Sequence, residues 1–166
     1  MANELYNFLR VRASHSYRML LRELDGLSEK DAIKFVYSDW PDHRWGVGQN
    51  GSIAGIVYHV AAWKQMTLPV FQVDGRLMTT DEFQSTAELY PGPADWHAVL
   101  SWLQAVGDEW NREMLLQSPE GFESSRDWEG KAIPVRSFVV EMYEHDIQHA
   151  SQIAYLKQRL GCASEK

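Results

Sequence analysis

The chain has almost no cysteine, fewer basic than acidic side chains, and no long apolar run. Its one cysteine, Cys162, excludes an intrachain disulfide, which fits a cytoplasmic location. Sixteen Lys and Arg against 23 Asp and Glu give a net charge of −7, so nucleic acid is not an expected partner. No segment reaches membrane-spanning length, and the N-terminus lacks a basic segment followed by an apolar run. We therefore expect a soluble protein without a membrane partner.

The 166 residues, 45% of them hydrophobic, are enough for one well-filled core, so we predict a single domain over residues 1–166. Four segments have apolar residues three or four apart, which predicts four amphipathic helices. The first is expected over roughly 3–27. Its apolar stripe consists of Leu5, Phe8, Leu9, Ser16, Leu20, Leu24 and Leu27. The second begins after Ser52, whose hydroxyl can cap the helix, and ends or kinks before Pro69.

The third helix is expected between Pro93 and Pro119, and the fourth ends at Gly161. The third stripe is Trp96, Val99, Leu103, Val106, Trp110 and Met114. The fourth is Phe138, Met142, His145, His149, Gln152/Ile153, Leu156 and Leu160. Residues 127–134 are predicted to form a small hairpin. These elements predict an all-α four-helix bundle, and the long connection over 27–52 predicts a topology less simple than up-down-up-down.

Two histidines lie one turn apart on the fourth stripe. Because a helix advances about 100° per residue, the rings of His145 and His149 project from one face and could share one ion. His59 lies on the stripe of the second helix and is the natural third ligand if these helices are neighbours. Three neutral imidazoles would leave a fourth tetrahedral position open, as in catalytic rather than structural metal sites.

A core role is the alternative for each histidine. A lone inward histidine is more often a core residue that hydrogen-bonds a backbone carbonyl than a metal ligand. Three of them on two core stripes fit that interpretation poorly, because each buried polar group costs about 1–3 kcal/mol if it stays unpaired. The pattern therefore favours a metal site on His59, His145 and His149.

Two motifs also resemble those of a known family, the DinB/YfiT-like four-helix-bundle proteins, which are often described as metal-dependent enzymes. The segment Ser52-Ile-Ala-Gly-Ile-Val-Tyr-His59 resembles the family's helix-opening serine followed seven residues later by a ligand histidine. The segment His145-Asp-Ile-Gln-His149-Ala-Ser-Gln152 resembles its late H-x-x-x-H-x-x-Q. The resemblance covers nearly the whole chain. It implies a divalent ion, usually zinc or nickel, on the three histidines, and often a homodimer.

The chain departs from the family pattern at two positions near the start of the second helix. Gly51 stands where the family commonly has Trp, and Gly55 stands where it commonly has an acidic residue. Substrate contacts near that helix start are therefore in doubt. The three ligand positions themselves are intact.

Residues around the histidines are candidates for supporting roles. Asp146 or Glu144 could accept the far ring N–H of a ligand histidine, or both could be solvated charges, which is the better interpretation for Glu144. Gln152 could hydrogen-bond a metal-bound water or cap a buried polar patch. Trp63, one turn beyond His59, could form one wall of a pocket above the metal.

Other metal and cofactor patterns fit less well. The run His145–His149 differs from the zinc-protease motif H-E-x-x-H by an Asp in place of Glu and by the lack of a downstream third ligand. The glycines of 46–51 match G-x-G-x-x-G, but no strand–helix–strand unit surrounds them. The chain has no Glu-x-x-His, which di-iron carboxylate bundles need. The other histidines that we considered, His15, His43 and His97, are assigned no role.

Two functions remain open from the sequence. The first is a metal-dependent enzyme that activates a thiol or water, with a small-molecule substrate. Because characterised relatives include thiol S-transferases and a thiol-dependent isomerase, the resemblance implies a low-molecular-weight-thiol S-transferase slightly ahead of a hydrolase. Arg12, which is expected on the inner side of the first helix, is the candidate to hold the carboxylate of such a thiol. The second function is a non-catalytic, stress-associated or ligand-binding dimer with a structural metal.

Overall fold

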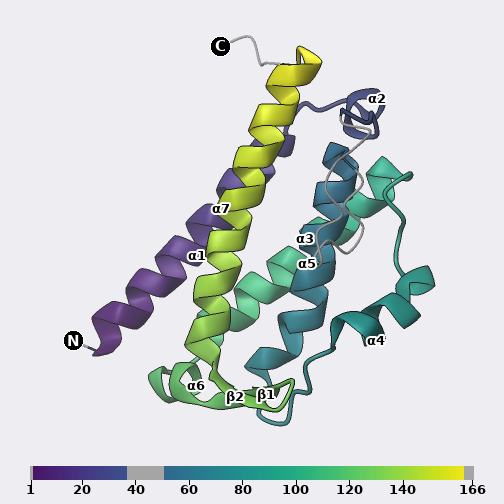
Figure 1. The fold of residues 1–166 in the computed structure, drawn as a ribbon. Coiled ribbons are helices and arrows are strands. Elements are labelled where there is room, and N and C mark those ends of the chain that lie inside the picture. The colour runs from purple at the N-terminus through teal and green to yellow at the C-terminus, as the bar shows by residue number, and fades with distance from the viewer. Residues whose placement is uncertain (1, 37–50, 163–166) are drawn as a thin grey trace.

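Four long helices form a bundle in the computed structural model, which describes residues 2–36 and 51–162 (Figure 1). They are α1 (Ala2–Leu24), α3 (Ile53–Thr67), α5 (Trp96–Leu116) and α7 (Val135–Leu160). The Ser52 hydroxyl accepts a hydrogen bond from the Gly55 N–H at 3.0 Å and so caps α3. Gly161 ends α7 in the left-handed conformation, at φ +75°. The prediction of four helices is confirmed, including the capping serine and the terminating glycine.

Short elements fill the connections between the long helices. They are α2 (Glu29–Ala32), η1 (Leu68–Phe71), α4 (Thr80–Ser85), η2 (Ala87–Leu89), α6 (Pro119–Glu123), β1 (Ser125–Trp128) and β2 (Lys131–Pro134). Pro69 lies in the 3₁₀ turn η1, so the second predicted helix does stop where the proline requires it. In the described part of the chain, no helix combines the length and apolar character needed to cross a bilayer.

The long helices are not arranged in sequence order around the bundle. α1 packs against α7 and α5, and α3 packs against α5 and α7 (Figure 1). Near the C-terminal ends of α1 and α7, Lys157 donates to the Glu23 carbonyl oxygen, so these two helices run parallel. The consecutive helices α1 and α3 therefore lie diagonally across the bundle. This confirms the prediction of a topology less simple than up-down-up-down.

The seam between α3 and α7 is antiparallel and places the residues of the candidate site. Residues early in α3 meet residues late in α7, since His59 contacts His149 while Thr67 lies with Glu141 beside one pocket. α3 is buried around most of its circumference, because α5 and α7 flank it. Side chains on this helix are consequently held in the interior whether they are apolar or not.

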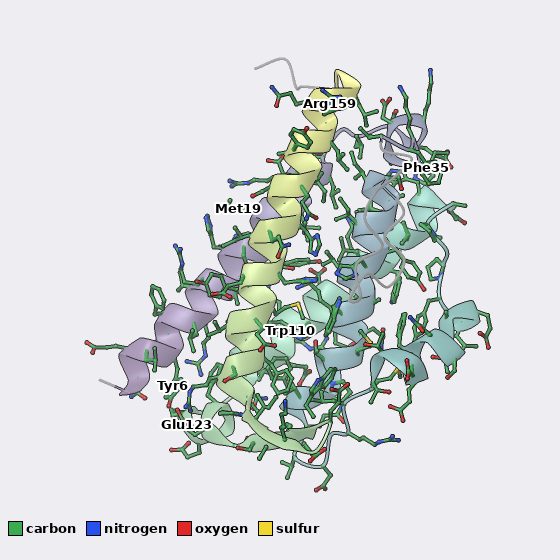
Figure 2. All side chains as sticks on the ribbon, in the orientation of Figure 1. Tyr6, Met19, Phe35, Trp110, Glu123 and Arg159 are labelled. Carbon is green, nitrogen blue, oxygen red and sulfur yellow. The ribbon has the colours of Figure 1, made fainter. Side chains whose placement is uncertain are left out.

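The first predicted stripe is wrong at the N-terminal end of α1. Leu5 and Phe8 are 49% and 55% exposed, while Tyr6 and Leu9 are buried. Tyr6 stacks on Phe122 of α6 with ring centroids 5.1 Å apart, and Figure 2 shows it beside that region of the molecule. The sequence did not predict α6, so the side of α1 that it covers was not expected to be apolar. The helix also ends at Leu24, three residues earlier than predicted.

Close packing between α1 and α5 depends on one glycine. A β-carbon at Gly107 would collide with the ring of Tyr17, so the two helices can approach this closely only without a side chain there. All six residues predicted for the third stripe are buried, and Trp110 lies in the middle of the bundle (Figure 2).

The predicted hairpin is confirmed and closes the lower end of the bundle in Figure 1. β1 and β2 pair antiparallel with Trp128 opposite Lys131. The two turn residues, Glu129 and Gly130, have φ of 53° and 77°, as a tight two-residue hairpin requires. Trp128 at the end of β1 packs against Trp63 of α3, with ring centroids 6.3 Å apart. The hairpin thereby brings an aromatic ring next to the α3–α7 seam.

Candidate metal centre

The three predicted histidines meet in the seam between α3 and α7. His145 Nε2 lies 3.1 Å from His59 Nε2 and 3.1 Å from His149 Nε2. One ring nitrogen from each histidine lies within 4.8 Å of the other two, and no further Cys, Asp or Glu in residues 2–36 and 51–162 joins this group. His59 and His149 are 4% and 2% exposed, and His145 is half-buried. We call these residues the histidine cluster.

Gln152 fixes the orientation of one ring in the histidine cluster. His149 Nδ1 lies 2.7 Å from Gln152 Oε1, which accepts the Nδ1 proton. His149 Nε2 is then unprotonated and presents its lone pair to the cluster. This is the arrangement of a ligand histidine whose far nitrogen is held by a hydrogen-bond acceptor. Two roles were predicted for Gln152, a hydrogen bond to a metal-bound water and a cap on a buried polar group. The hydrogen bond to the buried His149 ring is a contact of the capping kind.

The histidines cannot satisfy one another by hydrogen bonds alone. A neutral imidazole has one N–H and one lone pair, so the single Nε2 of His145 cannot form good hydrogen bonds with two other Nε2 atoms. His145 Nδ1 is also buried without a hydrogen-bond partner. Unpaired buried polar atoms are rare in folded proteins and call for a physical explanation. A cation at the centre of the cluster would account for the close approach of the three Nε2 atoms, but it would not contact His145 Nδ1.

The residues fit a divalent ion. Two nitrogens bound to one zinc at about 2.0–2.1 Å with a tetrahedral angle would lie about 3.3 Å apart, close to the 3.1 Å separations in the histidine cluster. Imidazole nitrogens suit zinc and nickel alike. Among the described residues, three side chains supply the ligand atoms, so a tetrahedral ion held by them alone would have one further position for water or substrate.

Burial favours the neutral form of His145 and His149, which is the protonation state that binds metals. Burial lowers the pKa of His149 to about 4, against a contribution from Gln152 that raises it. Burial, followed by the charges of His149, His59 and Lys64, lowers the pKa of His145 well below its ordinary value. At neutral pH a metal ion would therefore displace no proton from these two rings.

A buried ion pair lies next to the histidine cluster in the same seam. Lys64 Nζ is 2.9 Å from Asp146 Oδ2, and the two side chains are 1% and 2% exposed. Asp146 was a candidate partner for a ligand histidine, but the structure places its carboxylate against Lys64 instead. Burial raises the pKa of Asp146, and the Lys64 charge and hydrogen bond oppose that shift. The ion pair joins the two helices that carry the histidines.

Sequence reasoning missed Lys64. A lysine in Val60-Ala-Ala-Trp-Lys64 resembles an ordinary solvated charge, and only the apolar surroundings all along α3 hinted that it would be buried. Its ammonium also lies over the rings of Tyr17 and Trp110, 5.0 and 5.2 Å from their centroids.

The remaining predicted residues are distributed as follows. Glu144 is exposed, which agrees with a solvated charge. Arg12 is also exposed, over the Phe8 ring, so the prediction that it faces inward is wrong. His15 and His97 are exposed on the surface. His43 and most of the glycine motif at 46–51 lie outside the described residues.

A pocket of about 250 Å³ adjoins the histidine cluster, and His145 forms part of its wall. Trp63 lines it as predicted, together with Trp128 and Phe138. Glu141, one turn before His145, contributes a carboxylate. We call this space the aromatic pocket. It gives a small molecule a mostly apolar place to bind beside the histidines.

A second, larger pocket of about 540 Å³ shares Trp128 with the aromatic pocket. Its lining is polar and includes two arginines, Arg76 and Arg126, as well as the carboxylates of Asp74, Asp127 and Glu129. Arg126 is buried, and its Nε has no hydrogen-bond partner. We call this space the polar pocket.

Comparison with known proteins assigns the chain to a family. No curated protein matches it. A family model described as the DinB superfamily matches residues 12–153, a range that includes the three histidines and all four long helices for most of their length. Together with the helical bundle and the histidine cluster at the expected positions, this match shows that the chain belongs to the DinB superfamily.

Proposed function

We propose that the chain is a metal-dependent transferase that joins a low-molecular-weight thiol to a small electrophile. The observation that carries this proposal is the convergence of three imidazole nitrogens beside the aromatic pocket, with no fourth Cys, His, Asp or Glu ligand among residues 2–36 and 51–162. A divalent ion held by His59, His145 and His149 would lower the pKa of a coordinated thiol or water. That chemistry produces a nucleophile at neutral pH.

The chain's own residues contribute position and exclusion of water. Gln152 holds the His149 ring with its Nε2 toward the cluster. Trp63 packs against both His59 and His145, with ring centroids 6.3 and 6.1 Å away, and shields the histidines on that side. In the transfer, the thiol gives its proton to solvent, its sulfur bonds to the electrophilic carbon, and the leaving group departs with the bonding electrons.

Two neighbouring pockets favour a reaction of two substrates over hydrolysis. The aromatic pocket suits an electrophile with an apolar body, and the polar pocket on the other side of Trp128 suits a thiol with carboxylates. Arg126, which lines the polar pocket, is the residue that we expect to hold such a carboxylate, in place of Arg12. A hydrolase would need only one of these pockets.

Turnover measurements test the proposal. The zinc- and nickel-loaded protein is given cysteine or glutathione with an aryl halide, and separately an activated ester without thiol. We expect thiol transfer that a chelator abolishes, that His149→Ala lacks and that the exposed-histidine control His97→Ala keeps. Ester cleavage without thiol transfer would favour a hydrolase. Transfer that ignores the chelator, or no turnover at all, would contradict the proposal.

We also propose that the chain forms a homodimer through α1. Leu5, Phe8, Val11 and Met19 lie on one side of this helix and are 37–63% exposed. The outer position of Met19 is visible in Figure 2. Sedimentation of the wild type and of Phe8→Glu tests this. A dimer that Phe8→Glu converts to a monomer is expected, and a wild-type monomer would refute it.

A further inference from the structure

The aromatic pocket has walls suited to a cation. Trp63 and Trp128 pack with their rings 29° from parallel, and Phe138 meets Trp128 edge-on with ring centroids 6.0 Å apart. The three rings thus form one continuous aromatic wall contributed by α3, β1 and α7. Aromatic faces carry partial negative charge, and such walls attract alkylammonium groups that have been taken out of water.

Glu141 adds a full negative charge to this wall. It is the one carboxylic acid among the described residues that line the aromatic pocket, and no lysine or arginine of the described chain lines it. Partial burial, and then the charge of Glu144, raise the pKa of Glu141. A bound cation would oppose that shift and favour the carboxylate. The net charge of −7 also attracts cations and repels anions over longer distances.

The Thr67 hydroxyl, which also lines the pocket, does not compete for a ligand. The Thr67 hydroxyl donates to the Trp63 carbonyl oxygen at 2.7 Å and accepts from Trp110 Nε1 at 3.2 Å. Its hydrogen-bonding capacity is therefore largely used within the bundle. Recognition in this pocket is left to the aromatic rings, to Glu141 and to His145 of the histidine cluster.

We propose that the aromatic pocket binds small organic cations, with a quaternary or alkylated ammonium group against the rings and Glu141. That such a cation is the acceptor substrate rests on the function proposed above, whereas its binding does not. Glu141 and His145 lie four residues apart on α7, which is a rise of about 6 Å. An ammonium group at Glu141 therefore places atoms only a few bonds away from it beside His145. The volume of about 250 Å³ limits the ligand to a small molecule.

A pair of isosteres tests the charge requirement. Choline and 3,3-dimethylbutan-1-ol have the same shape, but only choline is charged. Binding of each to metal-free and metal-loaded protein is measured by calorimetry and by the fluorescence of the tryptophans. We expect choline to bind about tenfold more tightly than the neutral alcohol, because a cation gains from both the rings and the carboxylate.

Variants assign the effect to the pocket. Glu141→Gln should remove most of the preference for choline. The control is Glu144→Gln, which should keep the preference, because Glu144 is exposed on the same helix and does not line the pocket. Trp128→Leu should weaken both ligands.

Three results would overturn the proposal. The first is equal affinity of the wild type for choline and the neutral alcohol, and the second is no binding of choline. The third is a preference for choline in Glu141→Gln that is as large as in the wild type. Binding is measured on the metal-free protein as well as on the metal-loaded protein. A failure to bind choline can therefore be told apart from a failure to bind metal. Choline binding without any thiol transfer would keep this inference and contradict only the proposed function.

Discussion

The seam between α3 and α7 contains two buried polar groups of residues side by side, the Lys64–Asp146 ion pair and the histidine cluster. They differ in whether their members have opposite charges or are all of one kind. In the ion pair, Lys64 Nζ and Asp146 Oδ2 have opposite charges and lie 2.9 Å apart, while Asp146 Oδ1 is buried without a hydrogen-bond partner. In the histidine cluster, three imidazoles converge, and the Nε2 of His145 lies 3.1 Å from the Nε2 of each of the other two, so it cannot form a good hydrogen bond with both. The ion pair therefore holds the helices together, and the histidine cluster is available for an ion.

Breaking the ion pair should have the largest effect on stability. Lys64→Met or Asp146→Leu leaves one buried charge without its partner, which costs about 3–5 kcal/mol of unfolding free energy at pH 7. The double variant Lys64→Met/Asp146→Leu should recover most of that loss, because no lone charge remains. Urea unfolding measures all three.

The exposed Arg112, which pairs with Glu109 and Glu113, provides the control for this prediction. Arg112→Met should leave the urea midpoint unchanged, since surface pairs contribute little. If the single variants at Lys64 and Asp146 are as stable as the wild type, or if the double variant loses the sum of both, the ion pair does not hold the seam.

Lowering the pH should destabilise the metal-free protein through the histidine cluster. The folded-state pKa values of His145 and His149 lie below the ordinary 6.5, so the unfolded chain binds protons that the folded chain does not. Stability therefore falls as the pH drops below 6.5 and continues to fall toward 4, by up to about 1.4 kcal/mol per pH unit for each histidine.

Variants isolate that slope from the titration of carboxylates. His149→Ala should reduce the slope between pH 6.5 and 4 by one proton, and His97→Ala, which changes an exposed ring, should not. Urea unfolding at a series of pH values measures the slopes. Identical slopes in the wild type and His149→Ala would show that His149 is not buried as a neutral ring.

Removing the acceptor of the His149 ring should weaken metal binding without abolishing it. Gln152→Leu leaves Nδ1 without a partner, and losses of this kind typically cost about 10- to 100-fold in affinity. Gln152→Glu keeps an acceptor and should retain affinity. The exposed Gln148 on the same helix is the matched control, since Gln148→Leu should change nothing. Equal affinities in all four proteins, by competition with a chelator, would argue against this role.

The smallest expected effect is that of Ser52→Ala, which should lower the stability of α3 without changing metal binding. Ser52→Ala removes the cap of α3 and should cost about 1 kcal/mol of unfolding free energy. The metal content should not change, because Ser52 lies two turns before His59 in the chain. Thermal unfolding and elemental analysis of one preparation measure both quantities. Loss of metal in this variant would mean that the cap also positions the histidine cluster.

The sequence predicted most of what depends on helical periodicity. The buried stripes of α5 and α7, the cap at Ser52 and the terminator at Gly161 follow from local spacing and local chemistry, whereas α3 is buried on most sides and has no single stripe. The three histidines could be predicted because His145 and His149 lie four residues apart on one helix. They need only one neighbouring helix with an inward ring, His59, to complete the cluster. Local rules sufficed for these features.

What the sequence did not predict depends on long-range packing. Tyr6 is buried only because α6 folds against it, and no periodicity in α1 indicates that contact. Lys64 is buried because α5 and α7 flank α3, and its partner Asp146 is 82 residues away in the chain. The aromatic pocket combines residues of α3, β1 and α7, so Glu141 could not be related to Trp63 or Trp128 before the helices were placed.

The metal stoichiometry of the untagged protein tests the central claim most directly. After equilibration with zinc or nickel and removal of free ions, elemental analysis should find one ion per chain in the wild type and in His97→Ala. His59→Ala and His149→Ala, checked for folding by circular dichroism, should hold none. A wild type without metal, or His59→Ala and His149→Ala with as much as the wild type, would contradict a metal centre in the histidine cluster.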